Sequence, residues 1–456
     1  MTTGSPFWTV LRFSVPLMIG DFCQQLYNTV DSIIVGRVVG KGALAALGVA
    51  GPIMSIVLFL LVGVAMGVGV VISQHFGAGR YERLRRAAAT GLAIGIVCSL
   101  AIAAISIGLS RPFLAWMRTP ESILDSTDLY LKIVFAGAIF TYLYNFYCFG
   151  IRAIGNAFAP LMFLLVSVGL NAVLDVLFVA AFGMGVAGAA IATVVAQLVS
   201  AAMCIVYTHL RVPMLGLRLR DLRIDRKELP AVLSYGSSMA LQQVFIYVGR
   251  IAVQGLVNRY DVNVIAGVNS ATRLDALIQT PIRGYTNALT TYCAQNYGAR
   301  RFDRIRRGYR ASWIGVVAYT VVSMTLGILC AEPLVRLFVD ADETQVVRVG
   351  ADFVIAMASG YLFMCVIVQS QAYMKGVGLL KSFFGSTATA IAFRIGLSYL
   401  FEHFWGLRGM YWAVPASWLV GALYGMTVVA LSWRRRCAPR VDADVCTDAD
   451  CDDSDS

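Results

Sequence analysis

Residues 74–86 read QHFGAGRYERLRR, and residues 295–307 read QNYGARRFDRIRR. The two stretches align without a gap at an offset of 221 residues. Two shorter pairs follow in the same order along the chain: RAIG (152–155) with KGVG (375–378), and GVAG (185–188) with GLRG (406–409). Because the matches keep their order, the chain is predicted to consist of two related halves.

The composition indicates what each half is made of. Hydrophobic residues make up 58% of the 456 residues and charged residues only 14%, whereas a soluble domain carries about 25% charged residues. Stretches near or above 18 apolar residues recur, and each is long enough to cross the bilayer as a helix. A membrane β-barrel would need alternating apolar and polar residues, which are absent. We expect an all-α membrane protein with twelve spans, near 11–36, 44–73, 88–110, 129–150, 158–182, 186–208, 231–257, 263–294, 311–330, 351–374, 382–401 and 409–432.

Six spans per half return the chain to its starting side, so the halves share one orientation. The prediction is two pseudo-symmetric six-helix bundles. The N-lobe covers residues 1–215 (helices 1–6) and the C-lobe residues 216–435 (helices 7–12). The acidic segment 436–456 is polar and small, and is expected to be a disordered cytoplasmic tail.

The basic residues predict the topology. They cluster in alternate gaps between apolar stretches, above all in 80–86, 211–227, 300–310 and 434–436. Basic loops stay in the cytoplasm, so both termini are expected inside a multi-pass plasma (inner) membrane protein. The net charge of +11 therefore indicates membrane topology, and we expect no nucleic-acid partner.

Ionisable side chains inside predicted spans are candidates for function, because burying them in lipid is costly. The first half has three such acids: Asp21, Asp31 and Asp175. Helical spacing places further polar side chains on the Asp31 stripe: Gln24, Tyr27 and Asn28. Asn171 lies four residues before Asp175 and shares its face. Two nearby carboxylates can bind a proton or Na⁺, which predicts ion coupling. Pro16 is expected to bend the first helix.

The second half is not a copy at these positions. At the offset of 221, Ala252 stands opposite Asp31 and Gly396 opposite Asp175. The second half instead holds intramembrane Arg250, Arg273, Asp275, Arg283 and Arg394. We therefore expect coupling in the first half and substrate selection in the second, with Asp21, Gln24, Tyr27, Asn28, Arg250, Asp275 and Arg394 as candidates for lining a cavity.

Several stretches together resemble the MATE family of multidrug and toxic compound extrusion transporters: YNTVDSIIVGR (27–37), SQHFGAGR (73–80), RAIGNAFAP (152–160), NAVLDVLFV (171–179), GVAGAAIAT (185–193) and AQNYGARR (294–301). The resemblance extends to about residue 435. It implies a V-shaped cavity between two lobes and export of drugs and metabolites in exchange for H⁺ or Na⁺, with no other cofactor.

The resemblance also implies residue roles. Asp31, Asn145, Asn171, Asp175 and Thr193 correspond to the N-lobe cation site, and Na⁺ would bind at Asp31, Asn171, Asp175 and Thr193. The match is closest to the N-lobe cation-site (DinF-like) branch, because the tenth span lacks a central acid.

Other functions fit less well. A lipid or lipid-linked sugar flippase of the same superfamily is the alternative, and the arginines of the second half favour it. A channel is expected to carry a filter-like motif, which is absent. Only three histidines are present and no catalytic or metal-binding spacing occurs, so we expect no enzyme. The expected partners are small amphipathic organic compounds and the bilayer, with the protein a monomer. The sequence leaves the transported compound and the coupling ion open.

Overall fold

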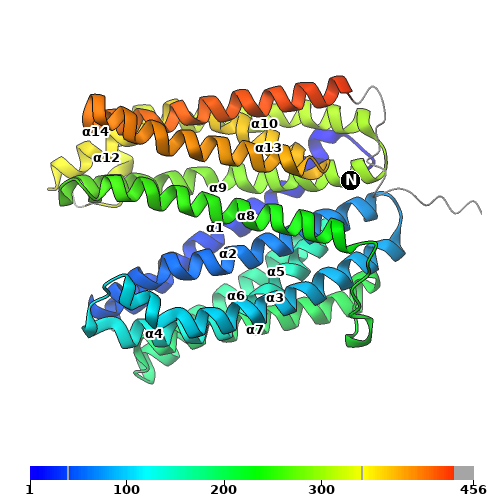
Figure 1. Ribbon diagram of the computed structural model, residues 1–456, viewed down its shortest axis with the longest axis horizontal. Helices are drawn as coiled ribbons and strands as arrows, with labels where there is room; N and C mark the ends of the chain where they lie inside the picture. The colour runs from blue at the N-terminus through cyan, green and yellow to red at the C-terminus, as the bar shows by residue number, and fades with distance from the viewer. Residues whose placement is uncertain (39–40, 340–341, 436–456) are drawn as a thin grey trace, which may run out of the picture.

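The computed structural model describes residues 1–38, 41–339 and 342–435; from residue 26 to 38 it describes the backbone alone. Within these ranges the chain is helical, and Figure 1 shows two bundles, one made of α1–α7 and the other of α8–α14. The predicted tail 436–456 lies outside the described residues.

The first bundle begins with long apolar helices. Its elements are α1 (Pro6–Val38), α2 (Lys41–Gly77), α3 (Tyr81–Trp116), α4 (Glu121–Ala136), α5 (Ala138–Ala153), α6 (Phe158–Asp175), the π-helical η1 (Val176–Ala181) and α7 (Gly185–Arg211). A linker with two short 3₁₀ turns, η2 (Pro213–Leu215) and η3 (Leu219–Asp221), leads to the second bundle. That bundle contains α8 (Leu229–Val257), α9 (Val262–Gly298), α10 (Phe302–Leu329), α11 (Ala331–Val335), α12 (Thr344–Ser359), α13 (Tyr361–Gly376) and α14 (Leu380–Arg435).

Twelve membrane crossings result from these elements. Among the described residues, seven helices are long and apolar enough to span a bilayer, and the bent pairs α4–α5 and α12–α13 raise this to nine. The backbone of α14 leaves the helical region at Gly406, so this element contains two crossings. Helices α1 and α9 complete the set, and they carry the intramembrane charges that lower their hydropathy. The predicted all-helical fold of twelve spans is confirmed.

The backbone repeats between the two bundles. The fourth span of each is broken, by 43° between α4 and α5 and by 52° between α12 and α13. Left-handed residues recur at the offset of 221: φ is 70° at Gly79 and 55° at Arg300, and 58° at Gly185 and 61° at Gly406. Since a side chain disfavours this conformation, the turn at Arg300 retains the geometry of the repeat against local preference.

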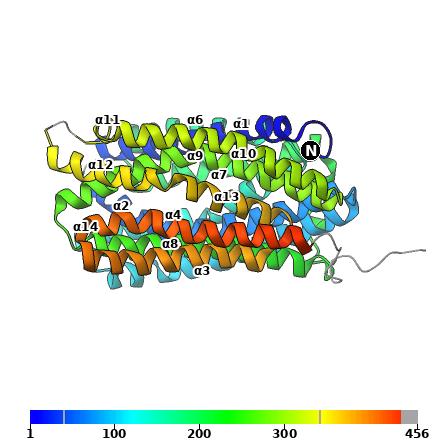
Figure 2. The same cartoon turned by 90° about the horizontal axis from the view of Figure 1, so that it is seen from above.

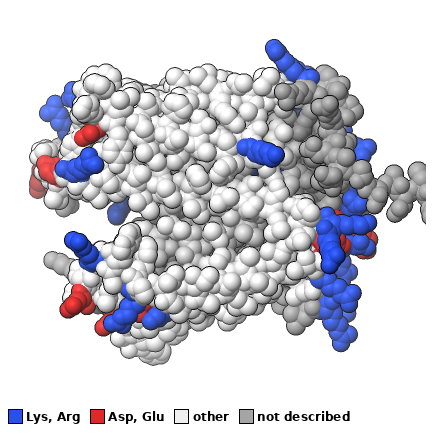
Figure 3. Space-filling model, in the orientation of Figure 1, with Lys and Arg blue, Asp and Glu red and all other residues white. Residues whose placement is uncertain are grey.

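The bundles touch along part of their length. Helix α2 packs against α8 and α9, and α1 packs against both α6 and α9. Figures 1 and 2 place the first residues and the end of α14 at one end of the molecule, and Figure 3 shows basic side chains gathered there. At the opposite end, Figure 3 shows a hollow between the bundles. We call these the Arg-rich end and the cleft end.

Candidate transport site

A buried polar cluster joins α6 and α7 in the first bundle. Asn171 and Asp175 are 1% and 0% exposed. With its amide oriented to satisfy both neighbours, the Asn171 nitrogen donates to Asp175 Oδ2 at 2.8 Å and its oxygen accepts from the Thr193 backbone N–H at 3.2 Å. The structure thus brings together three of the predicted site residues from two helices.

The local backbone at this cluster is unusual. The α-helical hydrogen bonding of α6 ends at Asp175 and continues as the π-helix η1, an irregularity frequent at functional sites. Gly188 of α7 lies so close that a Cβ there would be 3.1 Å from the Phe178 backbone of η1. Glycine at this position therefore lets α7 approach the segment that follows the carboxylate.

A second charged group lies in the other bundle. The Asp275 carboxylate accepts hydrogen bonds from Gln279 at 2.6 Å and from the Tyr361 hydroxyl at 3.1 Å. Arg250 of α8 and Arg394 of α14 are near enough to interact electrostatically with it. Within the described chain neither guanidinium forms an ion pair, and Arg394 Nε is buried without a hydrogen-bond partner.

A third group lies where the bundles converge. Asp21 of α1 interacts electrostatically with Arg152 of α5 and Arg283 of α9, one from each bundle. Arg152 lines a small pocket of about 30 Å³ together with Leu17, Met66, Gly69, Val70, Ser73, Phe149, Asn287, Thr290 and Thr291. Residue 152 falls in the predicted gap between spans 129–150 and 158–182, whereas the structure turns its side chain inward. Lys375, which stands opposite Arg152 in the second half, is buried too. The RAIG/KGVG repeat was therefore the feature of the sequence from which the inward position of Arg152 could have been predicted.

Reciprocal contacts close the Arg-rich end. Gln74 Nε2 of α2 donates to the Gly376 carbonyl at 3.0 Å, and Gln295 Nε2 of α9 donates to the Ala153 carbonyl at 2.7 Å. Each glutamine thus reaches from its own bundle to the end of the bent span in the other bundle. We call Gln74, Gly77, Gln295 and Gly298 the interlobe contact.

The glycines make this contact possible. A Cβ on Gly77 would lie 1.9 Å from the Gln295 carbonyl oxygen, and one on Gly298 would lie 1.8 Å from that of Gln74. Only hydrogen fits at either position. These residues belong to the quoted repeat, but the repeat did not predict the contact, because a repeat does not show that its copies touch.

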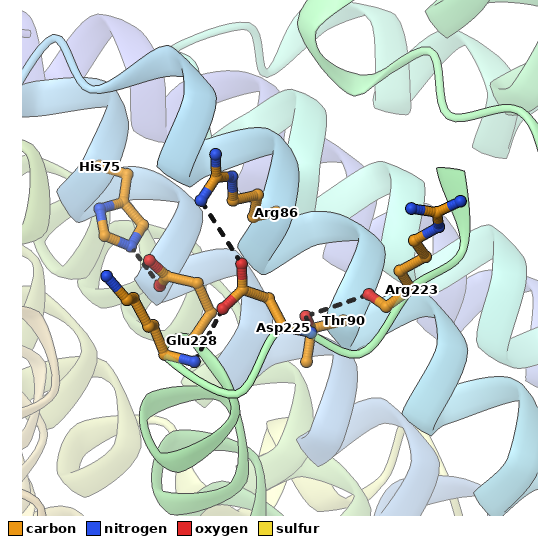
Figure 4. A network of polar contacts seen from close by, with 7 residues as sticks. His75, Arg86, Thr90, Arg223, Asp225 and Glu228 are labelled. Carbon is orange, nitrogen blue, oxygen red and sulfur yellow. Dashed lines mark hydrogen bonds and ion pairs between the residues drawn. The ribbon is translucent and has the colours of Figure 1, made fainter. Parts of the chain in front are cut away.

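The linker is fixed to the first bundle beside this contact. His75 and Glu228 lie 2.8 Å apart, Arg86 and Asp225 lie 3.7 Å apart, and the Asp225 N–H donates to Thr90 at 2.9 Å (Figure 4). Asp221 accepts from the Arg218 N–H and pairs with Arg85 at 2.7 Å, and these contacts hold the pKa of its carboxyl below the ordinary 3.8. The linker thus stays with the first bundle up to the start of α8.

With this geometry established, comparison with known proteins identifies the family. Residues 16–177 and 238–400 match the family described as MatE. The chain belongs to the MatE family. The two matched segments have nearly equal lengths and fall one in each half, as the internal repeat requires.

Similar proteins cover nearly the whole chain. A probable multidrug resistance protein YpnP of Bacillus subtilis (strain 168) is 28% identical over 92% of this chain and 90% of its own length. The multidrug export protein MepA of Staphylococcus aureus (strain MSSA476) is 22% identical over 93% and 94%. A solved outward-facing multidrug resistance MATE family transporter of the MOP superfamily has a TM-score of 0.87, with 23% identity over 94% and 97%. These findings confirm the predicted family and the expectation of a transporter rather than an enzyme.

The remaining residues that the sequence predicted for the site of this MatE chain lie on α1 and α5. Asn145 is half-buried, and its amide nitrogen donates to Thr141 of its own helix at 2.8 Å rather than to Asn171 or Asp175. Gln24 is half-buried on α1. Pro16 lies inside α1, two residues before the point where Met18 contacts Gly284 of α9. The side chains of Tyr27, Asn28 and Asp31 lie outside the described residues.

Proposed function

We propose that this MatE protein exports amphipathic organic compounds by secondary active antiport, in exchange for H⁺ or Na⁺. The observation that supports it most is the buried Asn171–Asp175–Thr193 cluster. A carboxylate at this depth costs several kcal/mol unless it is hydrogen-bonded, protonated or bound to a cation. Its occupancy by a cation can therefore change when water enters the bundle.

In this proposal Asp175 and Asp31 carry the coupling charge. Asn171 and Thr193 supply the amide and hydroxyl oxygens that a sodium ion would need, and a proton would need only the carboxylates. Asn145 is proposed as an additional ligand after a rotation of its side chain. No further cofactor is required.

Transport would proceed by alternating access between the two lobes, residues 1–215 and 216–435. The interlobe contact holds the Arg-rich end closed, while a hollow opens at the cleft end (Figure 3). Parallel repeats that rock about a shared site are typical of secondary transporters. Breaking the contact and closing the hollow would expose the same site to the other side.

We further propose that the Arg-rich end faces the cytoplasm of a plasma (inner) membrane, so that both termini are inside and the hollow faces outward. A green fluorescent protein fused after Ser456 should then fluoresce, and alkaline phosphatase fused there should be inactive. Active phosphatase would reverse the orientation.

We expect a monomer, which size-exclusion chromatography with light scattering measures directly.

Gradient-driven flux in proteoliposomes tests the antiport. Flux of rhodamine 123 or of fluorescein should require either a proton or a sodium gradient, and an Asp31→Asn/Asp175→Asn variant should lose the gradient-dependent part. Asp303→Asn is the matched control, because Asp303 is an exposed acid in the first turn of α10. Gradient-driven flux that survives in the double variant would rule out the assignment.

A second function is translocation of a lipid or lipid-linked sugar through the same cleft. Arg250 and Arg394, which form no ion pair with any residue that the structure describes, favour it because they could receive a phosphate. Loss of a labelled lipid from one leaflet, measured by dithionite quenching in proteoliposomes that show no flux of rhodamine 123 or fluorescein, would select this function over drug export.

A further inference from the structure

A set of interacting ionisable groups extends from the convergence of the bundles into the second bundle, and among the described residues it carries more positive than negative charge. The members of this set are Asp21, Arg152, Arg250, Asp275, Arg283 and Arg394. Four of these are arginines and two are acids. Arg283 connects the groups, because it interacts with Asp21 at the convergence of the bundles and with Arg250 and Asp275 in the second bundle.

The acids do not neutralise these arginines by direct pairing. Both oxygens of Asp275 accept hydrogen bonds, from Gln279 and Tyr361. Arg394 Nε is buried and lacks a partner, and Arg250 and Arg283 form no ion pair in the described chain. A cation in the apolar zone is costly and normally acquires a counter-charge. Here the protein leaves the fork-shaped guanidinium donors available to an anion, for which their geometry is well suited.

An aromatic surface lies beside the arginines. Arg250 stands over the face of Tyr247 at 5.6 Å from the ring centroid. Tyr247 in turn stacks on Phe59 of α2 at 5.2 Å, so this pair spans the two bundles. Flat apolar surface next to unpaired cations is suited to a molecule that has both an aromatic body and a negative group.

We propose that the cleft selects amphipathic organic anions, whose carboxylate, sulfonate or phosphate binds Arg250 and Arg394 while the apolar body packs on Tyr247 and Phe59. The inference rests on the proposed function and names its substrate class. Substrate anion and coupling cation then occupy different lobes, since the buried acid cluster lies on α6 and α7 and the arginines on α8 and α14.

Binding of two dyes with one skeleton and opposite charge tests the proposal. Fluorescein is an anion and rhodamine 123 a cation at pH 7.5, and both contain a xanthene ring system. The purified full chain in nanodiscs should bind fluorescein more tightly. An Arg250→Gln/Arg394→Gln variant should weaken fluorescein binding by about tenfold or more, as expected for loss of charged hydrogen bonds.

Arg310→Gln is the matched control, because Arg310 also stands over an aromatic ring, Trp433, but lies in the basic segment 300–310 away from the cleft. It should leave fluorescein binding unchanged. If Arg394→Gln does not fold, Arg250→Gln alone carries the test. Tighter binding of rhodamine than of fluorescein to the wild type, or equal fluorescein affinity in wild type and double variant, would overturn the proposal.

Two further measurements separate related outcomes. Competition by dioctanoyl phosphatidate that the double variant loses would assign the anion site to a lipid headgroup, whereas fluorescein binding that dioctanoyl phosphatidate does not displace would assign it to soluble anions. Gradient-driven rhodamine flux without fluorescein binding would leave the antiport intact and refute the anion selectivity. Arginine-dependent fluorescein binding without gradient-driven flux would refute the antiport instead.

Discussion

At the scale of single residues, the polar groups near the Arg-rich end are matched in pairs. His75 is 8% exposed and Glu228 5% exposed, and their side chains meet at 2.8 Å. One comes from the end of α2 and the other from the residue before α8. The pair therefore ties the first helix of the second lobe to the first lobe.

Replacing His75 by Ala should destabilise the protein. Glu228 would remain buried without its partner, which costs about 1–3 kcal/mol. Thermal unfolding in detergent should show a lower midpoint, and the paired variant His75→Ala/Glu228→Ala should recover part of the loss. An unchanged midpoint in the single variant would mean that the pair contributes nothing to stability.

The contacts of Asp221 predict that the local stability of the linker depends on pH. The Arg218 N–H and then Arg85 hold the pKa of its carboxyl below 3.8. Because the folded pKa is depressed, the contact is fully present above the ordinary value and is lost as pH falls through the lower, folded value. Hydrogen exchange in residues 219–223, corrected for intrinsic rates, should stay constant from about pH 8 to 5 and rise only below about 4. Asp221→Asn should exchange faster throughout; a constant corrected rate down to pH 2 would contradict the assignment.

At the scale of elements, α1 contacts both lobes. Gly20 faces Leu161 and Leu164 of α6, and Met18 meets Gly284 of α9. Pro16 lies just before these contacts and cannot donate a backbone hydrogen bond to the preceding turn. A helix held on both sides has to deform when the lobes move apart. We expect it to bend at Pro16, where the backbone hydrogen bond is missing.

Replacing Pro16 by Ala should therefore slow transport without unfolding the protein. A proline inside a straight helix costs about 3 kcal/mol, so the variant should be at least as thermally stable as the wild type. Gradient-driven flux should decrease while dye binding persists. Normal flux together with increased stability would show that bending at Pro16 is not required.

At the scale of the whole molecule, the two lobes meet through the glycines of the repeat. The same motif occurs once in each lobe, and the two copies contact each other with backbone atoms. Such a contact is strong only in one arrangement, because a small displacement removes both glutamine hydrogen bonds together. It can therefore act as one of two discrete states.

Replacing Gly298 by Ala should favour the state in which the Arg-rich end is open. Its Cβ would lie 1.8 Å from the Gln74 carbonyl oxygen, so the lobes would have to separate. Cys293, which is fully buried next to this contact, should then react faster with a maleimide, as measured by peptide mass spectrometry. Gly255→Ala is the control, since nothing lies within 4 Å of a Cβ there. Equal labelling in the two variants would contradict the prediction.

The sequence alone determined the number of spans, the two related halves and the family. These follow from apolar length and from repeated motifs, which are local properties of the chain. It also predicted the pairing of Asn171 with Asp175, because four residues on one helix share a face. The inclusion of Thr193 came from the family resemblance, and the structure places its backbone N–H beside Asn171.

Only the tertiary structure decided which distant residues meet. It turned Arg152 inward, joined the two copies of the repeat face to face, and left Arg250 and Arg394 near Asp275 without an ion pair to any described residue. These features depend on how the two lobes pack, and contacts between segments hundreds of residues apart leave no periodic signal in the chain. The helices follow from local hydropathy, whereas the charged cleft follows from the packing of whole bundles.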